Sequence, residues 1–188
     1  MKNMLFILFF PLFSAFTSPA AFGAAPFITG PDVRIANNNI IVKTSIADIA
    51  GFEQRVKASI GKEIILTVEL MRVWDFWPDE FIVSKKIRKI VKYDNLRDRY
   101  RASWRDGITR TDRIFTDFNL MKNWILSEDN MSIANIKELG PGDYYIRVVV
   151  ESRSREKIPL LGLLMYLLPE VEMSLAKESQ PFKAGIDK

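Results

Sequence analysis

Apolar side chains recur at every second position in several separate stretches of this chain. The clearest is Tyr144–Val150, whose apolar positions are Tyr144, Ile146, Val148 and Val150. Because successive side chains of a strand point to opposite faces, this period predicts strands that bury one face. The same period occurs in residues 32–47, 63–74, 81–93 and 100–115. The pattern therefore predicts a chain that folds mainly into antiparallel sheets.

Turn-forming residues separate these stretches. Asn37–Asn39 tolerate a positive φ and predict a hairpin between the strands on either side. Asp106 and Gly107 predict a second hairpin, with a type I′ turn that needs a positive φ at both central residues.

Three residues in these strands are relevant to which side chains point toward the core. In residues 63–74 we expect Trp74 to point inward with the other apolar residues. In residues 81–93, Lys85 and Lys89 interrupt the apolar face. The two lysines predict a bulge, an exposed strand end or a sheet edge in that strand.

Two segments change to a period of about four residues, which is typical of helices. Gly51–Ile60 predicts a short amphipathic helix, and Thr116 is expected to cap a second one with Phe118, Met121 and Ile125 buried. Short strands are expected in 131–136 and 171–175. With about nine strands, two or three short helices and no βαβ rhythm, the chain is predicted to be β-rich α+β, with antiparallel, sandwich-like sheets.

The first 23 residues have the order of a secretory signal peptide. A positive head, Met1-Lys2, precedes an apolar run that ends near Phe16. Ala21 and Gly23 then suit the two positions where the signal peptidase tolerates only small side chains, which predicts cleavage after Gly23. Residues 24–188 are thus expected to form a single exported domain with a short polar C-terminal tail. An uncleaved N-terminal anchor is the alternative, although the run is shorter than the roughly 20 residues of a membrane span.

The chain contains no Cys and no His. Without them a protein lacks disulfides and the usual ligands of zinc, copper, haem and iron–sulfur clusters. Catalysis by Ser–His or Cys–His pairs is excluded as well, so that carboxylates, Lys, Tyr, Ser and Thr remain for chemistry. We expect no metal and no cofactor. The net charge of +4 is modest, and we expect no nucleic acid as a partner of an exported protein.

Several segments resemble, in order and spacing, a bacterial exported family catalogued as domain of unknown function 4390. They are Val68–Arg72, Trp74, Trp77–Glu80, Val91–Leu96 and Tyr100, supported by Thr116–Phe118 and Pro141-Gly142. The resemblance implies a Gram-negative envelope protein located in the periplasm. It implies no activity and no catalytic residues. The chain departs from the family pattern at Val171–Leu175, where an aromatic-rich strand is expected.

Aromatic and acidic residues gather around Pro78, and we single out Trp74, Trp77, Asp79 and Glu80 as a candidate partner-binding site. Such a patch can hold a peptide or a sugar, with the rings supplying area and the carboxylates orientation. The alternative is a structural corner in which the tryptophans cap the core. A third interpretation is a hydrolase site built from Asp75, Asp79 and Glu80, which needs two carboxyls roughly 5–9.5 Å apart across a cleft.

Asp94 and Asp98 suggest a Ca²⁺ loop, but they lack its alternating ligands, central Gly and closing Glu, which favours a plain hairpin turn.

Basic residues alternate along two neighbouring predicted strands. Lys86, Arg88, Arg99 and Arg101 are candidates for binding an anionic surface. Alternatively, like charges keep an exposed sheet face from aggregating. The apolar run Leu160–Leu168 is too short to span a membrane, and it is expected either to be buried as a short helix or to contact a partner or a membrane surface.

These features favour a non-enzymatic protein–protein interaction module of the envelope, whose protein partner is not identified by the sequence. The alternative is a peripheral protein that binds membrane or an anionic envelope polymer. A carboxylate-dependent hydrolase is the third hypothesis.

Overall fold

The computed structural model describes residues 25–59, 61–155 and 171–185. The predicted signal peptide and the run Leu160–Leu168 lie outside the described residues. Within them the chain forms ten strands, two α-helices and one 3-10 helix. In chain order these are β1 (Phe27–Ala36), β2 (Asn39–Ala47), α1 (Phe52–Ala58), β3 (Gly61–Arg72), β4 (Glu80–Asp94), β5 (Arg99–Arg105), β6 (Arg110–Phe115), α2 (Phe118–Leu126), β7 (Ser127–Asn135), η1 (Ile136–Glu138), β8 (Gly142–Arg155), β9 (Val171–Glu178) and β10 (Phe182–Ala184).

Seven strands form a large antiparallel sheet. Its order is β10-β8-β3-β4-β5-β6, and β9 also pairs with β8. β9 lies along Arg147–Arg153, whereas β10 pairs with Gly142–Tyr144 on the same strand. The two C-terminal strands therefore follow one another along a single edge of β8, and β6 forms the opposite edge of the sheet.

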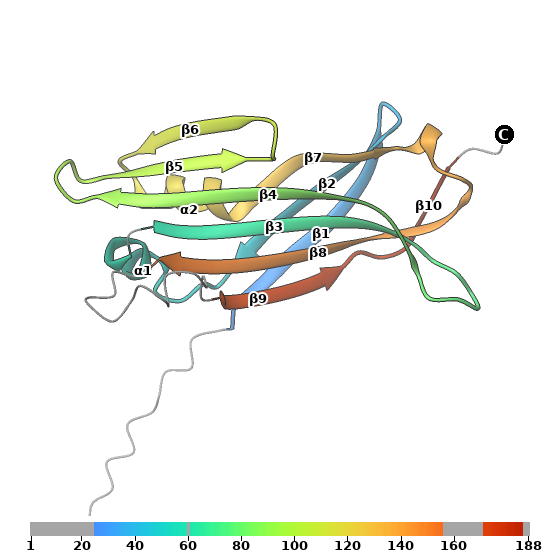
Figure 1. Cartoon of the computed structure of the whole chain (residues 1–188), viewed down its shortest axis with the longest axis horizontal. Helices are drawn as coiled ribbons and strands as arrows, with labels where there is room; N and C mark the ends of the chain where they lie inside the picture. Colours follow the sequence, from blue (N-terminus) through green and yellow to red (C-terminus); the bar gives the residue numbers. More distant parts are fainter. Residues whose placement is uncertain (1–24, 60, 156–170, 186–188) are drawn as a thin grey trace, which may run out of the picture.

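A smaller sheet, β1-β2-β7, packs against one face of the large sheet. Figure 1 shows β1 and β2 crossing behind the large sheet. Between the layers lie the alternating apolar residues of both sheets, among them Val42, Val68 and Val148, all fully buried. The two antiparallel sheets and short helices confirm the predicted α+β, sandwich-like fold.

A hydrogen bond between β9 and β1 joins the two layers. The ammonium of Lys177 in β9 donates a hydrogen bond of 3.0 Å to the carbonyl oxygen of Ile28 in β1. Within the large sheet, the buried ammonium of Lys62 in β3 donates to Ser154 at 3.0 Å and is ion-paired with Glu172 of β9. β1 and β9, which are far apart in the sequence, are thus connected between the two layers.

The two predicted hairpins form, but only one has the expected turn. Asn37 and Asn38 have φ values of +50° and +61°, as predicted for the tight turn between β1 and β2. Between β5 and β6 the connection has four residues, and φ is positive at Gly107 but not at Asp106. The carboxylate of Asp106 accepts bonds from the N–H groups of Ile108 and Thr109, so an Asx-type turn replaces the type I′ turn.

Helix α2 begins one residue later than predicted. Its N-cap is Asp117, whose carboxylate accepts a 2.8 Å hydrogen bond from the N–H of Leu120. Thr116 is therefore not the cap. Met121 and Ile125 are buried as expected, while Phe118 is half-buried against Tyr100, with ring centres 5.9 Å apart. Carboxylates are strong capping groups, and Asp117 occupies the N-cap position from which its side chain reaches the N–H of Leu120.

The prediction for the lysines of β4 was right for one and wrong for the other. β4 pairs with β5 only from Arg88 to Asp94. Lys85 precedes this paired part, so its segment of β4 is at an edge of the sheet. Lys89, in contrast, lies in the interior of the sheet, points inward and is only 4% exposed. Its buried ammonium is possible because Glu128 of β7 and the carbonyl oxygens of Trp124 and Ser127 surround it.

Strand boundaries differ from the prediction mainly at their ends. β7 begins at Ser127 rather than near residue 131, and β10 was not predicted at all. Trp74 follows the end of β3 and is exposed, so its predicted inward position was wrong.

Candidate functional site

The connection between β3 and β4 forms a narrow arm. The two strands pair along their length up to Arg72 and Glu80, and the arm continues through Val73–Asp79. Figure 1 shows this hairpin diverging from β8 and extending away from the body of the molecule. Its N-terminal side is anchored, because the N–H of Val73 donates a 2.8 Å bond to the carbonyl oxygen of Asp143 in β8.

The arm presents its aromatic side chains to solvent. Phe76 is 94% exposed and Trp77 is 77% exposed, and Phe81 and Trp74 are exposed by about half. We call these four residues the aromatic tip. Single exposed apolar residues are common on protein surfaces, whereas large contiguous apolar patches are rare on monomeric proteins. The structure therefore excludes the corner in which both tryptophans cap the core.

A guanidinium group holds the base of the arm. The Cζ atom of Arg72 lies 4.3 Å from the ring centre of Trp74 and 5.9 Å from that of Tyr144. Its Nη2 donates a 2.8 Å hydrogen bond to the carbonyl oxygen of Pro141. A Cβ at Gly142 would lie 3.0 Å from Nε of Arg72, so the glycine leaves room for this side chain. Stacking and hydrogen bonding together fix Trp74 at the edge of the fold.

The carboxylates of the arm bind Trp74 as well. Its indole N–H donates a 3.2 Å bond to Glu80, and its backbone N–H donates a 3.4 Å bond to Asp79. Burial, together with a hydrogen bond to Asp79, raises the pKa of Tyr145 above its usual range. Asp79 and Glu80 thus orient the arm, and they do not face each other across a cleft as a pair of hydrolytic acids would.

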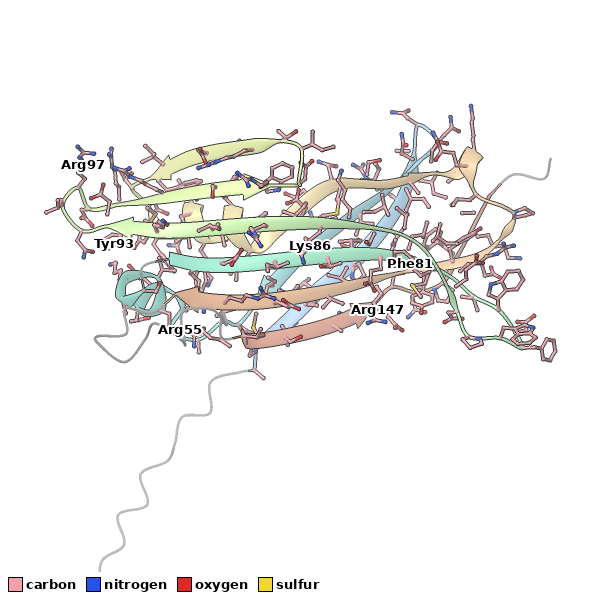
Figure 2. All side chains as sticks on the ribbon, in the orientation of Figure 1. Arg55, Phe81, Lys86, Tyr93, Arg97 and Arg147 are labelled. Carbon is pink, nitrogen blue, oxygen red and sulfur yellow. The ribbon has the colours of Figure 1, made fainter. Side chains whose placement is uncertain are left out.

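The basic candidates lie on the face of the large sheet that is turned away from the small sheet. Lys86 and Arg147 project from this face (Figure 2). Most of the charges are paired: Arg88 with Glu63 at 2.7 Å, and Arg101 and Arg99 with Asp94 at 2.9 and 3.6 Å. The face is therefore a mixed ionic network rather than a uniformly positive surface.

The suggested Ca²⁺ loop is a hairpin turn. Burial acts to raise the pKa of Asp94, but the hydrogen bond and charge of Arg101 outweigh it and hold that pKa below its usual value. Asp98 accepts a hydrogen bond from the hydroxyl of Tyr93 instead of facing a cation. Within the described ranges, no cluster of three or more Asp or Glu residues could hold a metal ion.

Three of the four predicted partner-site residues, Trp74, Asp79 and Glu80, contact each other, and Trp77 lies exposed beyond them. Phe76 lies within the predicted aromatic and acidic cluster, whereas Arg72 and Tyr144 were not predicted to belong to this site. Gly140 and Gly142 on either side of Pro141 were the available signal, because such glycines often mark the close approach of another group.

Some of the segments that carried the resemblance meet at the base of the arm. Arg72 and Trp74 come from one segment, and Pro141 and Gly142 from another about 70 residues away. No curated protein and no solved structure matches the chain. The family model described as Domain of unknown function (DUF4390) matches residues 32–176, and the chain therefore belongs to this family.

Proposed function

We propose that this protein is a non-enzymatic interaction module that binds a protein partner in the bacterial envelope through the aromatic tip. The observation that carries the proposal is the exposure of Phe76 and Trp77 at the end of an arm whose base is fixed by Arg72. Aromatic rings on a pre-ordered hairpin offer a large contact area at little cost in conformational entropy.

The chemistry of the arm favours a protein partner that carries basic residues. Asp75, Asp79 and Glu80 place three carboxylates beside the aromatic rings. An anionic membrane surface would be repelled by these groups, whereas lysine and arginine side chains would be attracted to them. Binding to a partner segment that alternates apolar and basic residues fits both features.

Two observations argue against the other hypotheses. Membrane or polymer binding by Arg88, Arg99 and Arg101 would compete with their ion pairs to Glu63 and Asp94. Hydrolysis by the acids of the arm would require carboxylates free to act on a substrate, and Asp79 and Glu80 are bound to Trp74.

The location in the periplasm is part of the proposal and rests on the N-terminal sequence. In the described part of the chain, no helix has the length and apolar character needed to cross a membrane.

Affinity capture with the tagged mature protein from envelope extracts tests the function. The variant Phe76→Ser with Trp77→Ala should lose the captured partner and keep its melting temperature, since both side chains are mostly exposed. The matched control is Leu96→Ser with Ile108→Ala, which removes two apolar side chains that are each 97% exposed in other turns.

Capture that survives in the tip variant would overturn the proposal. Salt-sensitive flotation with anionic vesicles, lost in Lys86→Glu with Arg88→Glu and kept in the tip variant, would establish the membrane hypothesis in its place.

A further inference from the structure

The large sheet is wider than the layer that covers it, and a cleft remains under its β6 edge. Helix α2 covers Tyr100 and Phe115 at one end of the overhang. Further along, Thr111 is paired with Trp104 and therefore points to the same inner side of the sheet. Trp104 and Thr111 line a cleft of about 360 Å³. The start of β7 lines its other side.

Polar and aromatic groups line the cleft from both sides. β5 and β6 contribute Trp104, Thr111 and Arg113, while α2 and β7 contribute Trp124, Glu128 and Asn130. Lys89 lies at the bottom, where burial lowers its pKa although the charge of Glu128 opposes that effect. The volume is at the lower end of the ~300–1,000 Å³ range of small-molecule sites.

Several of these groups are held in place by one another. Oε2 of Glu128 accepts a 2.9 Å bond from Lys89 and a 3.2 Å bond from the indole N–H of Trp104. The guanidinium carbon of Arg113 lies 5.6 Å from the ring centre of Trp124. The rings and the carboxylate are thus oriented before any ligand arrives, which reduces the entropy that binding must overcome.

The charges of the lining select the kind of ligand. Lys89 and Arg113 would repel a cation, and Glu128 and Asp129 would repel an anion. A purely apolar ligand would remove these polar groups from water without hydrogen bonds in return. A neutral ligand with one apolar face and many hydroxyl groups satisfies the rings, the acceptors and the donors together.

We infer that this cleft binds a neutral sugar unit, with a pyranose ring stacked on Trp104. Hydroxyl groups both donate and accept, so they can bond to Glu128 and to Thr111 or Asn130 at the same time. This site uses none of the residues of the aromatic tip and does not depend on the proposed function.

Tryptophan fluorescence tests the inference directly. The chain has four tryptophans, so the background variant Trp74→Phe with Trp77→Phe reports only on Trp104 and Trp124. The neutral probes are cellobiose, maltose and N,N′-diacetylchitobiose, and the charged probes are spermidine and citrate. We expect a saturable change with at least one neutral sugar and none with the charged probes.

Matched variants locate the binding. In that background, Thr111→Val and Asn130→Ala should weaken sugar binding by about fivefold to tenfold, the effect of losing one hydrogen bond. Asp112→Asn alters the neighbouring residue of β6 on the outer face and should leave binding unchanged. Failure of all three sugars to give a saturable change, or stronger binding of spermidine or citrate, would overturn the inference, as would sugar binding that both cleft variants retain.

Discussion

The ammonium of Lys89 lies 2.9 Å from Oε2 of Glu128, and both side chains are largely withdrawn from solvent. Lys89 also donates a 2.9 Å bond to the carbonyl oxygen of Trp124 at the end of α2. One lysine therefore ties the large sheet to both the helix and the small sheet.

Removing the negative partner should be costly. Glu128→Gln leaves the charge of Lys89 in a buried place without its counter-ion, and we expect a loss of about 3 kcal/mol in the free energy of unfolding. Urea denaturation measures it from the midpoint at constant slope. The double variant Lys89→Met with Glu128→Leu should recover most of the stability, and a loss below about 1 kcal/mol in Glu128→Gln would show that the pair is not buried in solution.

The lowered pKa of Lys89 makes a prediction about pH. Between that pKa and the ordinary value of 10.5, the unfolded chain binds more protons at this lysine than the folded chain does. Its contribution to the free energy of unfolding therefore increases as pH rises through this window. Urea denaturation of the wild type and of Lys89→Met, compared at increasing pH up to the ordinary value of 10.5, should show a difference that shifts in favour of the wild type.

The cap of α2 can be tested against its neighbour. Asp117→Ala should cost about 1 kcal/mol of stability, because the N–H of Leu120 loses its acceptor. Thr116→Ala should stay within about 0.5 kcal/mol, the usual range for a surface position. Thermal denaturation distinguishes the two, and the reverse order of effects would restore Thr116 as the cap.

Gly107 should be required for its backbone conformation alone. Its φ is +100°, and a Cβ there would meet nothing within 4 Å. We expect Gly107→Val to cost about 1–3 kcal/mol through backbone strain. Ile108→Ala in the same turn should have almost no effect on the denaturant midpoint, since the side chain is exposed. An unchanged midpoint in Gly107→Val would mean that the turn adopts another conformation.

The N-terminus gives a further prediction. N-terminal sequencing of the protein from a periplasmic fraction should begin at Ala24, as expected from small residues at Ala21 and Gly23. Full-length protein that remains with the membrane after salt washing would establish an uncleaved anchor.

Local sequence patterns were sufficient to predict where most strands lie. They did not predict which residues of other strands each side chain contacts. The alternation in Tyr144–Val150 identified β8, because one face of that strand is buried. The burial of Lys89 could not be predicted in this way, since its counter-ion Glu128 comes from a distant part of the chain. β10 has three residues and pairs only with Gly142–Tyr144, too short a segment for any period to be visible.

The candidate site was predicted only in part, because some of its contacts also join residues that are distant in sequence. Clustering around Pro78 was enough to select Trp74 and Trp77, but hydrophobicity alone favoured burying them. Their exposure follows from the length of the β3–β4 arm, and the position of Trp74 depends on Arg72 reaching Pro141. Contacts of this kind exist only once β3 and β8 are neighbours.

The bond between Lys177 and Ile28 has a consequence for how the molecule is made. The ribosome releases Ile28 149 residues before Lys177, so the segment between them must emerge before this bond between the layers can form. Contacts so distant in sequence are also slow to form. Until that bond can form, the newly made chain lacks one of the contacts that close it and can still be threaded or captured as an extended polymer.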